Sequence, residues 1–407
     1  MAQESPIKKT WKRLLRNKPA IISLVVIVLA IILAFLGPAV AMDKTPDADD
    51  QILELANVNP GFSTKMLLVR KNREENKVNP ATAFFMGREN PYQQIPISSY
   101  QFNDSGQIVV QAFKGEEHKA EEMRFSLADV VYPLSATSPD IHLENGKLNF
   151  TDFNGQPVSA DIQKLQKETT DKHIVLKKYR LGADDFGRDI LSRLILGIRV
   201  SLSVGIVAVI ISMTIGIFMG AIAGYFGGRT DDVITFLINI IWSIPTILLA
   251  MAISFSLGAI LDSYITIFIA IGLSMWVETA RIVRGQVLSV REMEYIQAAK
   301  GLGFSHFRII LKHILPNIIG PIMVLAASDF AAAILIESGL SFIGLGVKPP
   351  TPSWGNILNA HFHYLTSNKA FLAIAPGICI MVMVLVFNLL GNGLRDAFDV
   401  KGKIDTQ

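Results

Sequence analysis

The amino-acid sequence predicts an all-α polytopic membrane protein with six transmembrane helices and one inserted extracytoplasmic β-rich or α+β domain. Two observations predict this fold class. Half of the 407 residues are hydrophobic and the mean hydropathy is +0.39, although 18% are charged. A soluble domain seldom combines these values, so charged and apolar residues must be segregated. Six apolar runs approach or reach membrane-spanning length, whereas residues 42–180 contain none.

Residues 1–18 are predicted to be a cytoplasmic basic arm, with six basic residues against the single acid Glu4. Residues 19–41 predict the first transmembrane helix, because about 20 helical residues cross a hydrocarbon core of about 30 Å. A cleaved signal peptide is the alternative, but its apolar core is only about 7–15 residues long. The basic arm orients the N-terminus toward the cytoplasm.

Residues 42–180 differ in composition, with 20 acidic and 17 basic residues. Alternation of polar and apolar residues predicts strands, and Asn103–Gly106 and Asn154-Gly155 are typical hairpin turns. The predicted strands are 65–71, 94–102, 107–113 and 147–153, and residues 161–171 predict a short polar helix. We therefore expect an extracytoplasmic inserted domain. The polarity of the stretch leaves a partly disordered loop as the alternative.

Residues 181–400 predict a membrane core with five further transmembrane helices. Charged residues mixed with apolar ones at helical spacing in 181–202 predict an amphipathic helix on the membrane surface. The spans follow at about 200–225, 234–257, 264–279, 318–342 and 370–390, with Pro245 interrupting the third span and Pro376 the sixth. Gly216 and Gly220 form a small-xxx-small pair suited to close helix packing.

Six spans place the loop 281–317 and the tail 401–407 in the cytoplasm. The loop carries six basic residues against two acidic ones, which agrees with this orientation. Within it, Gln297, Ala298 and Ala299 favour helix, Gly303 interrupts, and a second helical run ends at Leu315-Pro316. Such a low-profile helix–turn–helix can occupy a groove on another protein. An ordinary amphipathic loop is the alternative.

The same residues resemble the cytoplasmic coupling motif of bacterial ABC importer permeases, in the branch of dipeptide, oligopeptide and nickel "C" subunits. Gln297-Ala298-Ala299, Gly303 and Leu315-Pro316 have the spacing of that motif, although Gln297 replaces its glutamate and His313 its isoleucine. Similar matches cover about 12–38 and 181–400 but not most of 42–180. They include Gly187-Arg188-Asp189, Arg281-x-Val283-Arg284-Gly285, Leu340-Ser341-Phe342, Pro352-Ser353-Trp354-Gly355 and Leu394-Arg395-Asp396, while Asn392 and Val400 depart from the family pattern.

The resemblance implies the type I ABC importer permease fold in a bacterial inner membrane, with both termini cytoplasmic. It implies half of a pathway for peptides, or for a related solute such as a nickel chelate. It implies four kinds of partner: a homologous second permease, two ABC ATPase subunits or domains, an extracytoplasmic solute-binding protein and membrane lipid. The residues that match the motif, Gln297, Ala298, Ala299, Gly303, Leu315 and Pro316, would contact the ATPase.

The sequence contains no P-loop pattern G-x-x-x-x-G-K-[ST], so we expect no enzymatic activity and no cofactor of this chain's own. ATP and magnesium would be bound by the partner ATPases. The single cysteine, Cys379, excludes an internal disulfide and a cysteine zinc site. We expect no metal site. We also expect no nucleic acid as a partner, because the bias of basic residues toward the cytoplasmic side of a membrane explains the basic clusters.

Two acidic residues, Asp329 and Glu337, lie inside the fifth span. A charged group is costly there and should face protein or a water-filled path. The two interpretations that remain open are lining of the translocation pathway and a hydrogen-bonded strut within the helix bundle. Glu278, near a membrane boundary, is expected to pair with Arg281.

Two other functions remain alternatives. The first is a secondary transporter or channel that works without ATP. The second is a membrane-anchored extracytoplasmic binding or assembly protein in which residues 42–180 do the work. The sequences of the spans leave the substrate open among dipeptides, longer peptides, antimicrobial peptides and nickel chelates.

Overall fold

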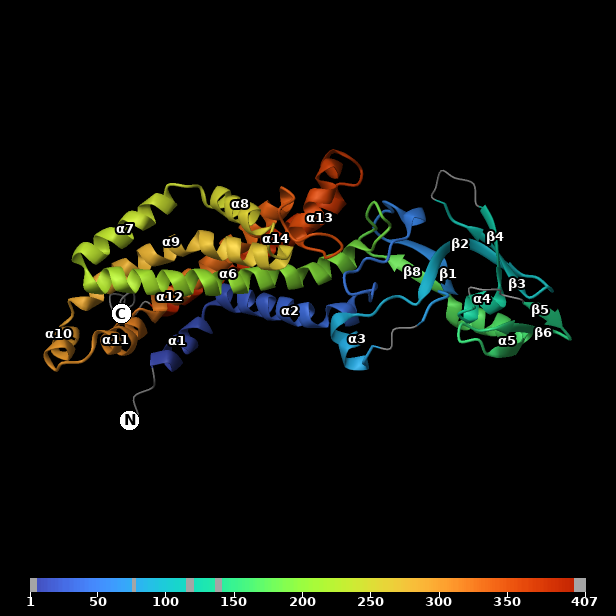
Figure 1. The fold of residues 1–407 in the computed structure, drawn as a ribbon, viewed down its shortest axis with the longest axis horizontal. Helices are drawn as coiled ribbons and strands as arrows, with labels where there is room; N and C mark the ends of the chain where they lie inside the picture. Colours follow the sequence, from blue (N-terminus) through green and yellow to red (C-terminus); the bar gives the residue numbers. More distant parts are fainter. Residues whose placement is uncertain (1–5, 75–77, 115–120, 136–140, 399–407) are drawn as a thin grey trace. The chain divides into compact units, whose positions relative to one another are not determined.

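The structure is a computed structural model that describes residues 6–74, 78–114, 121–135 and 141–398 (Figure 1). The predicted tail 401–407 and the departure at Val400 lie outside these residues. The chain divides into two compact units. The core unit comprises 1–35, 197–365 and 373–407, and the insertion unit comprises 36–196 and 366–372. The insertion unit therefore also includes the end of the first membrane helix and the beginning of the second.

The insertion unit is built on a five-stranded antiparallel sheet with strand order β4-β3-β2-β1-β8. A second sheet has the order β5-β6-β7, so the β-rich part of the prediction is confirmed. On β3, Ile108, Val110 and Ala112 alternate inward and join one apolar core with Leu67 and Leu127. The strands are β1 (Phe62–Arg70), β2 (Tyr92–Phe102), β3 (Gln107–Ala112), β4 (Glu121–Ser126), β5 (His142–Glu144), β6 (Lys147–Thr151), β7 (Pro157–Asp161) and β8 (Ile174–Tyr179).

Three short helices complete the insertion unit: α3 (Pro80–Met86), α4 (Leu127–Val131) and α5 (Ile162–Glu168). The predicted turns are confirmed. Asn103 accepts a hydrogen bond from the backbone N–H of Gln107 at 2.8 Å, and Gly106 has φ +71° between β2 and β3. Gly155 has φ +77° between β6 and β7. Positive φ suits glycine because it has no Cβ.

The amphipathic helix predicted over 181–202 is wrong for residues 181–189, whereas residues 190–202 are helical but form the first part of a longer helix. Residues 181–189 form an irregular segment, and one helix, α6 (Ile190–Phe226), begins only after it. The buried Asp184 accepts from Arg188 Nε at 2.7 Å and from the backbone N–H groups of Phe186 and Arg188. These bonds satisfy the backbone without a helix, which is how aspartate competes with helical pairing.

Among the residues that the structure describes, five helices are long and apolar enough to cross a membrane: α2 (Lys18–Val40), α6, α9 (Ser263–Arg291), α12 (Ile319–Phe342) and α14 (Phe371–Phe398). A further pair, α7 (Gly228–Trp242) and α8 (Thr246–Leu257), meets at a bend of 89°. Pro245 lies at this bend, where the third span was predicted to be interrupted. The predicted count of six holds only if the bent pair forms one span. The remaining helices are α1 (Pro6–Leu14) and α13 (Trp354–His361) with the elements described below.

Glycines on α6 allow it to pack closely against α9, as the small-xxx-small pair predicted. A Cβ at Gly216 would lie 2.4 Å from Thr279 Cβ, and one at Gly220 would lie 2.4 Å from the Ala280 carbonyl oxygen. Side chains at these positions would separate the helices. The α6–α9 contact brings the end of α6 beside the segment that follows α9.

Candidate functional site: a surface segment between two membrane helices

Residues 291–317, here called the coupling segment, connect α9 to α12 (Figure 1). The segment contains α10 (Glu294–Gly301) and α11 (His306–Ile309). A π-helical turn, Ile310–Ile314, and a 3₁₀ turn, Leu315–Asn317, lead into α12. The helix–turn–helix shape that the sequence predicts is therefore present.

The turn after α10 is a Schellman motif centred on Gly303. The Phe304 N–H donates to the Ala299 carbonyl at 3.2 Å, and the Gly303 N–H donates to the Lys300 carbonyl at 3.0 Å. Gly303 has φ +74°, which this motif requires at its glycine position. No atom lies within 4 Å of where its Cβ would stand, so the backbone conformation, not lack of space, favours glycine.

The residues that match the motif face in different directions. Gln297, Ala298, Gly303 and Pro316 are exposed, and Leu315 is half-buried. In contrast, Ala299 is only 4% exposed and packs in an apolar cluster with Ile296, Ile309 and Ile314. Ala299 therefore anchors α10 to its own chain, while its neighbours are available for contact.

Three side chains attach the coupling segment to the end of α6. Arg291 Nη1 donates to the Gly224 carbonyl at 3.0 Å and to the Tyr225 carbonyl at 3.4 Å. The Tyr225 hydroxyl and His306 Nδ1 are 2.9 Å apart, and the Lys300 ammonium lies 5.6 Å from the Tyr225 ring centre. Arg291 thus satisfies carbonyls that a helix end leaves unpaired. The segment is attached to α6 as well as to α9 and α12.

Gln297, which replaces the glutamate of the motif, has a specific contact. Its Nε2 donates to the Arg291 carbonyl at 3.2 Å. A carboxylate cannot donate this bond. The glutamine therefore supports the junction of α9 and α10, and its amide oxygen points to no partner that the described contacts supply.

Two exposed apolar side chains, which sequence reasoning missed, flank the turn. Leu302 is 74% exposed and Phe307 is 73% exposed, more than the other exposed large apolar side chains of the segment, Met293, Tyr295 and Leu311. Contiguous exposed apolar surface is typical of a region that contacts another protein. Their positions before and after Gly303 could have indicated their exposure, because neither residue continues a regular apolar face of a helix.

Asp329 on α12 is buried and connects three helices. The Thr279 hydroxyl of α9 donates to Asp329 Oδ2 at 3.1 Å, and the Ser212 hydroxyl of α6 lies 3.5 Å from the same oxygen. Asp329 is 4% exposed. Asp329 thus faces hydroxyl groups of α6 and α9.

Glu337 is fully buried, with 0% exposure, and lies among serine hydroxyls. Ser341 donates to Glu337 Oε1 at 2.8 Å, and Ser353, whose side chain caps α13, lies 3.4 Å from Ser341. This chain of hydroxyls connects α12 to the start of α13. Glu337 thus faces protein groups of its own chain.

The expected pair of Glu278 and Arg281 is wrong for the part of the chain that the structure describes. Arg281 instead stacks on Trp242, with 3.6 Å from its guanidinium carbon to the ring centre, and donates to Asn239 at 3.3 Å. Glu278 is exposed and lines a cavity of about 480 Å³ between α9, α12 and α14. Ser328 and Arg395 contribute the other polar groups of this lining.

No cluster of three or more metal-ligating side chains occurs among the residues that the structure describes. His306 contacts Tyr225, and His361 Nδ1 donates to the Ile357 carbonyl at 2.7 Å. His313 stacks on Phe304 with ring centres 5.8 Å apart. The described contacts of these three histidines are therefore with protein groups.

The geometry defines a class: a helical membrane protein that presents a folded polar segment, with exposed apolar side chains, between two of its membrane helices. Two family profiles match the chain. Residues 216–401 match the binding-protein-dependent transport system inner membrane component, and residues 5–60 match the N-terminal TM domain of oligopeptide transport permease C.

Curated relatives agree with these profiles. The dipeptide transport system permease protein DppC of Alkalihalophilus pseudofirmus is 42% identical over 222 residues, covering 54% of this chain and 72% of that protein. The oligopeptide transport system permease protein OppC of Bacillus subtilis is 38% identical, with 55% and 72% covered. The glutathione transport system permease protein GsiD of Pectobacterium atrosepticum is 38% identical, with 55% and 73% covered. The chain belongs to the family of ABC transporter permeases that includes DppC and OppC.

Proposed function

We propose that this chain is the transmembrane permease subunit of an ATP-driven ABC importer and forms half of the pathway for small peptides. Family membership supports the transport role, and the names of the relatives, which include dipeptide, oligopeptide and glutathione systems, support a peptide substrate. The partners in this proposal are a second permease, two ATPase subunits or domains and an extracytoplasmic binding protein. The proposed orientation places both termini and the coupling segment in the cytoplasm.

The observation that carries this proposal is the exposed apolar surface of the coupling segment. Leu302 and Phe307 flank a turn whose conformation is fixed by Gly303 and whose base is attached to α6. A partner that covers this surface and moves would also move the ends of α6, α9 and α12. ATP-driven closure of an ATPase pair would thereby shift the equilibrium between two conformations of the membrane helices.

The decisive substitution is Leu302→Asp. Because Leu302 is 74% exposed, aspartate there should leave folding and membrane abundance unchanged but disfavour an apolar contact. We expect loss of ATP-driven peptide uptake and of ATPase copurification. The matched control is Leu176→Asp in β8, where the leucine is 71% exposed in the insertion unit. Normal uptake by Leu302→Asp would contradict the docking role.

For the pathway, we propose that Glu278 and Arg395 provide its polar lining and that Asp329 and Glu337 support the bundle. The cavity beside Glu278 is open, whereas both other carboxylates are enclosed by hydroxyl groups. An exposed carboxylate on a membrane helix requires water or a polar partner. Glu278→Gln should change the preference for charged over neutral peptides without reducing the amount of protein in the membrane.

A further inference from the structure

The helix α3 (Pro80–Met86) of the insertion unit buries none of its seven residues. Its sequence, PATAFFM, has no charge and ends in three large apolar side chains. Phe84 is 49% exposed, Phe85 47% and Met86 62%. Short helices are unstable in water and normally depend on packing of an apolar face. An apolar helix that leaves about half of these side chains exposed is stabilised when another surface covers it.

The position of α3 identifies that surface. Directly after α3, the Arg88 N–H donates to the Lys44 carbonyl at 3.0 Å, and a Cβ at Gly87 would lie 2.7 Å from the same oxygen. Lys44 follows the end of α2 at Val40 by four residues. The 23 residues of α2 span about 35 Å, roughly the thickness of the hydrocarbon core, so Val40 lies near a membrane surface. This backbone contact ties the chain just after α3 to a residue four positions beyond that surface.

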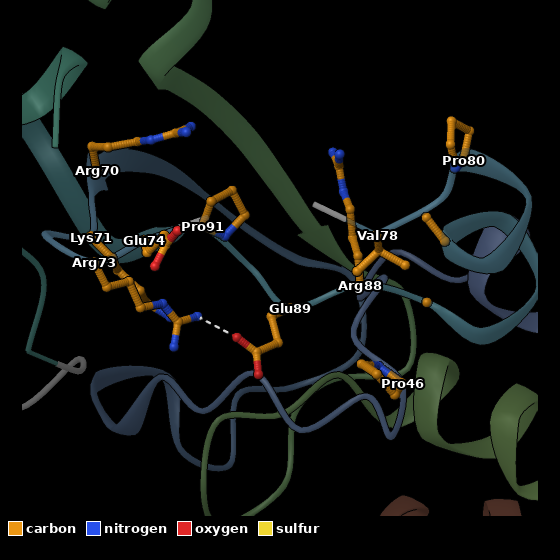
Figure 2. A pocket seen from close by; sticks show the side chains of 12 residues that line it. Pro46, Arg70, Lys71, Arg73, Glu74, Val78, Pro80, Arg88, Glu89 and Pro91 are labelled. Carbon is orange, nitrogen blue, oxygen red and sulfur yellow. Dashed lines mark ion pairs between the residues drawn. The ribbon is translucent and has the colours of Figure 1, made fainter. Parts of the chain in front are cut away.

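Behind α3 lies a cationic pocket, shown in Figure 2, with a volume of about 510 Å³. Four basic and two acidic side chains line it, together with Val78, Pro80 and Ala83 at the α3 side. The basic residues are Arg70, Lys71, Arg73 and Arg88.

Most of the basic side chains already have partners in the fold. Arg73 pairs with Glu89 at 2.9 Å, Lys71 donates to the Asn90 carbonyl at 3.1 Å, and Arg70 stacks on Tyr92. For Arg88 the described residues supply no side-chain hydrogen bond or ion pair, and in Figure 2 its side chain extends beside the pocket, away from the Arg73–Glu89 pair. Arg88 is also the residue whose backbone is bonded to Lys44.

We propose that α3 is an interfacial membrane helix and that the cationic pocket binds the phosphate of an anionic lipid headgroup. Aromatic side chains favour the boundary between hydrocarbon and water, and neighbouring basic residues attract anionic lipids. Phe84, Phe85 and Met86 enter the boundary region, and Arg88 faces the headgroup. This site does not depend on the proposed substrate or on the orientation of the chain.

The test uses the full chain in lipid nanodiscs, with Cys379→Ala to remove its single cysteine. Phe85→Cys is labelled with an environment-sensitive fluorophore, and Leu143→Cys on β5, where the leucine is 45% exposed, is the matched control. We expect blue-shifted emission and strong quenching by a lipid-borne quencher at position 85 only. Equal, water-like signals at both positions would overturn the proposal.

A second arm tests the headgroup. With phosphatidylglycerol in place of phosphatidylcholine, quenching at position 85 should increase at least twofold, and Arg88→Gln should abolish this increase. Arg124→Gln, whose arginine is exposed on β4 and pairs with Glu122, should preserve it. Lipid independence of the parent protein would overturn the headgroup site. A competition result would also overturn the headgroup site. If an alanine tripeptide with a free C-terminal carboxylate removed the lipid effect and the same tripeptide with a C-terminal amide did not, the pocket would be a site for a soluble anion.

Discussion

Two glycines of the coupling segment differ in the backbone angle φ, and this difference determines which of them the turn requires. Gly301 and Gly303 both have open space where a Cβ would stand, but only Gly303 has a positive φ, +74°. An L-residue in this left-handed conformation costs about 1–2 kcal/mol. Gly303 is therefore required for the shape of the turn, whereas Gly301 is not.

We predict that Gly303→Ala reduces peptide uptake without reducing the amount of protein in the membrane. The left-handed strain shifts the turn and moves Leu302 away from its position. Gly301→Ala is the matched control and should retain uptake, because alanine is favoured over glycine in a helix by about 0.5–1 kcal/mol. Uptake assays at equal expression compare the two variants. Equal activity would show that the turn tolerates distortion.

A second residue-level prediction concerns Asp329. Asp329→Asn keeps an oxygen that accepts from Thr279, so uptake and thermal stability should stay near those of the parent protein. Asp329→Leu leaves buried hydroxyl groups unpaired and should cost about 1–3 kcal/mol. Thermal unfolding in detergent measures the difference. A stable Asp329→Asn variant that fails to transport would instead support a role in the pathway.

For single residues, the sequence located the turn of the coupling segment but did not predict which of its side chains are exposed. The motif spacing located the turn at Gly303, and the structure confirms its helix–turn–helix shape. The same spacing placed Ala299 with its exposed neighbours, although Ala299 is buried against Ile309 and Ile314. Exposure depends on packing with α6 and α12, which local spacing does not encode. For the same reason Leu302 and Phe307 were missed.

Among the elements, α10 depends on its attachment to α6. We predict that Arg291→Gln uncouples the two, because the guanidinium no longer binds the carbonyls of Gly224 and Tyr225. The complex should then hydrolyse ATP while uptake falls at least tenfold. The measurement is the ratio of ATP hydrolysed to peptide imported. Arg229→Gln, on the neighbouring helix α7, is the control, and an unchanged ratio for Arg291→Gln would exclude a role in coupling.

Elements were predictable where the pattern was local and regular. Alternation identified β3 and β6, which bury every second residue. The strands β1 and β2 were also identified, although each buries consecutive residues. Strand β4 was missed because its side chains are mostly polar or half-buried. Residues 181–189 were included in a predicted helix because the apolar spacing of 190–198 suited one, but the hydrogen bonds of Asp184 favour an irregular segment before Ile190. Helix α3 has too few residues to show any period.

For the molecule as a whole, a buried histidine makes the insertion unit sensitive to acid. Burial lowers the pKa of His173 below its ordinary value of 6.5, and its Nδ1 donates to the Leu68 carbonyl at 2.8 Å. The unfolded chain therefore takes up this proton at a higher pH than the folded chain does. The contribution of neutral His173 to the free energy of unfolding is therefore complete above pH 6.5. It is lost as the pH falls from there toward the pKa of His173 in the folded chain.

We predict that protection of β1 and β8 amides against hydrogen exchange decreases as the pH falls below about 6.5, after correction for intrinsic rates. In His173→Asn, the amide can still donate to Leu68 but does not titrate, so this decrease should become smaller. His142→Asn, at an exposed position on β5, is the control and should behave as the parent protein. An equal decrease in all three proteins would assign the effect to other groups.

The number of membrane spans shows the limit of hydropathy. Within the described part of the chain, five helices are long and apolar enough to span, and α7 and α8 are separated by a bend of 89°. The sequence indicated the break through Pro245 but contained no measure of its angle. Hydropathy averages over a window and cannot distinguish a straight span from a bent one. The insertion was recognisable because its charges exclude a span.

The contacts of α7 have a dynamic consequence. Its first turn is held by Asp231, which pairs with Arg284 at 2.6 Å, and its last turn is held by the stacking of Arg281 on Trp242. Both arginines belong to α9, so moving α7 away from α9 would break a contact at each end of α7. The helix α8 also packs against α9. A change in the 89° bend between α7 and α8 would have to be absorbed by the backbone torsions of residues 243–245.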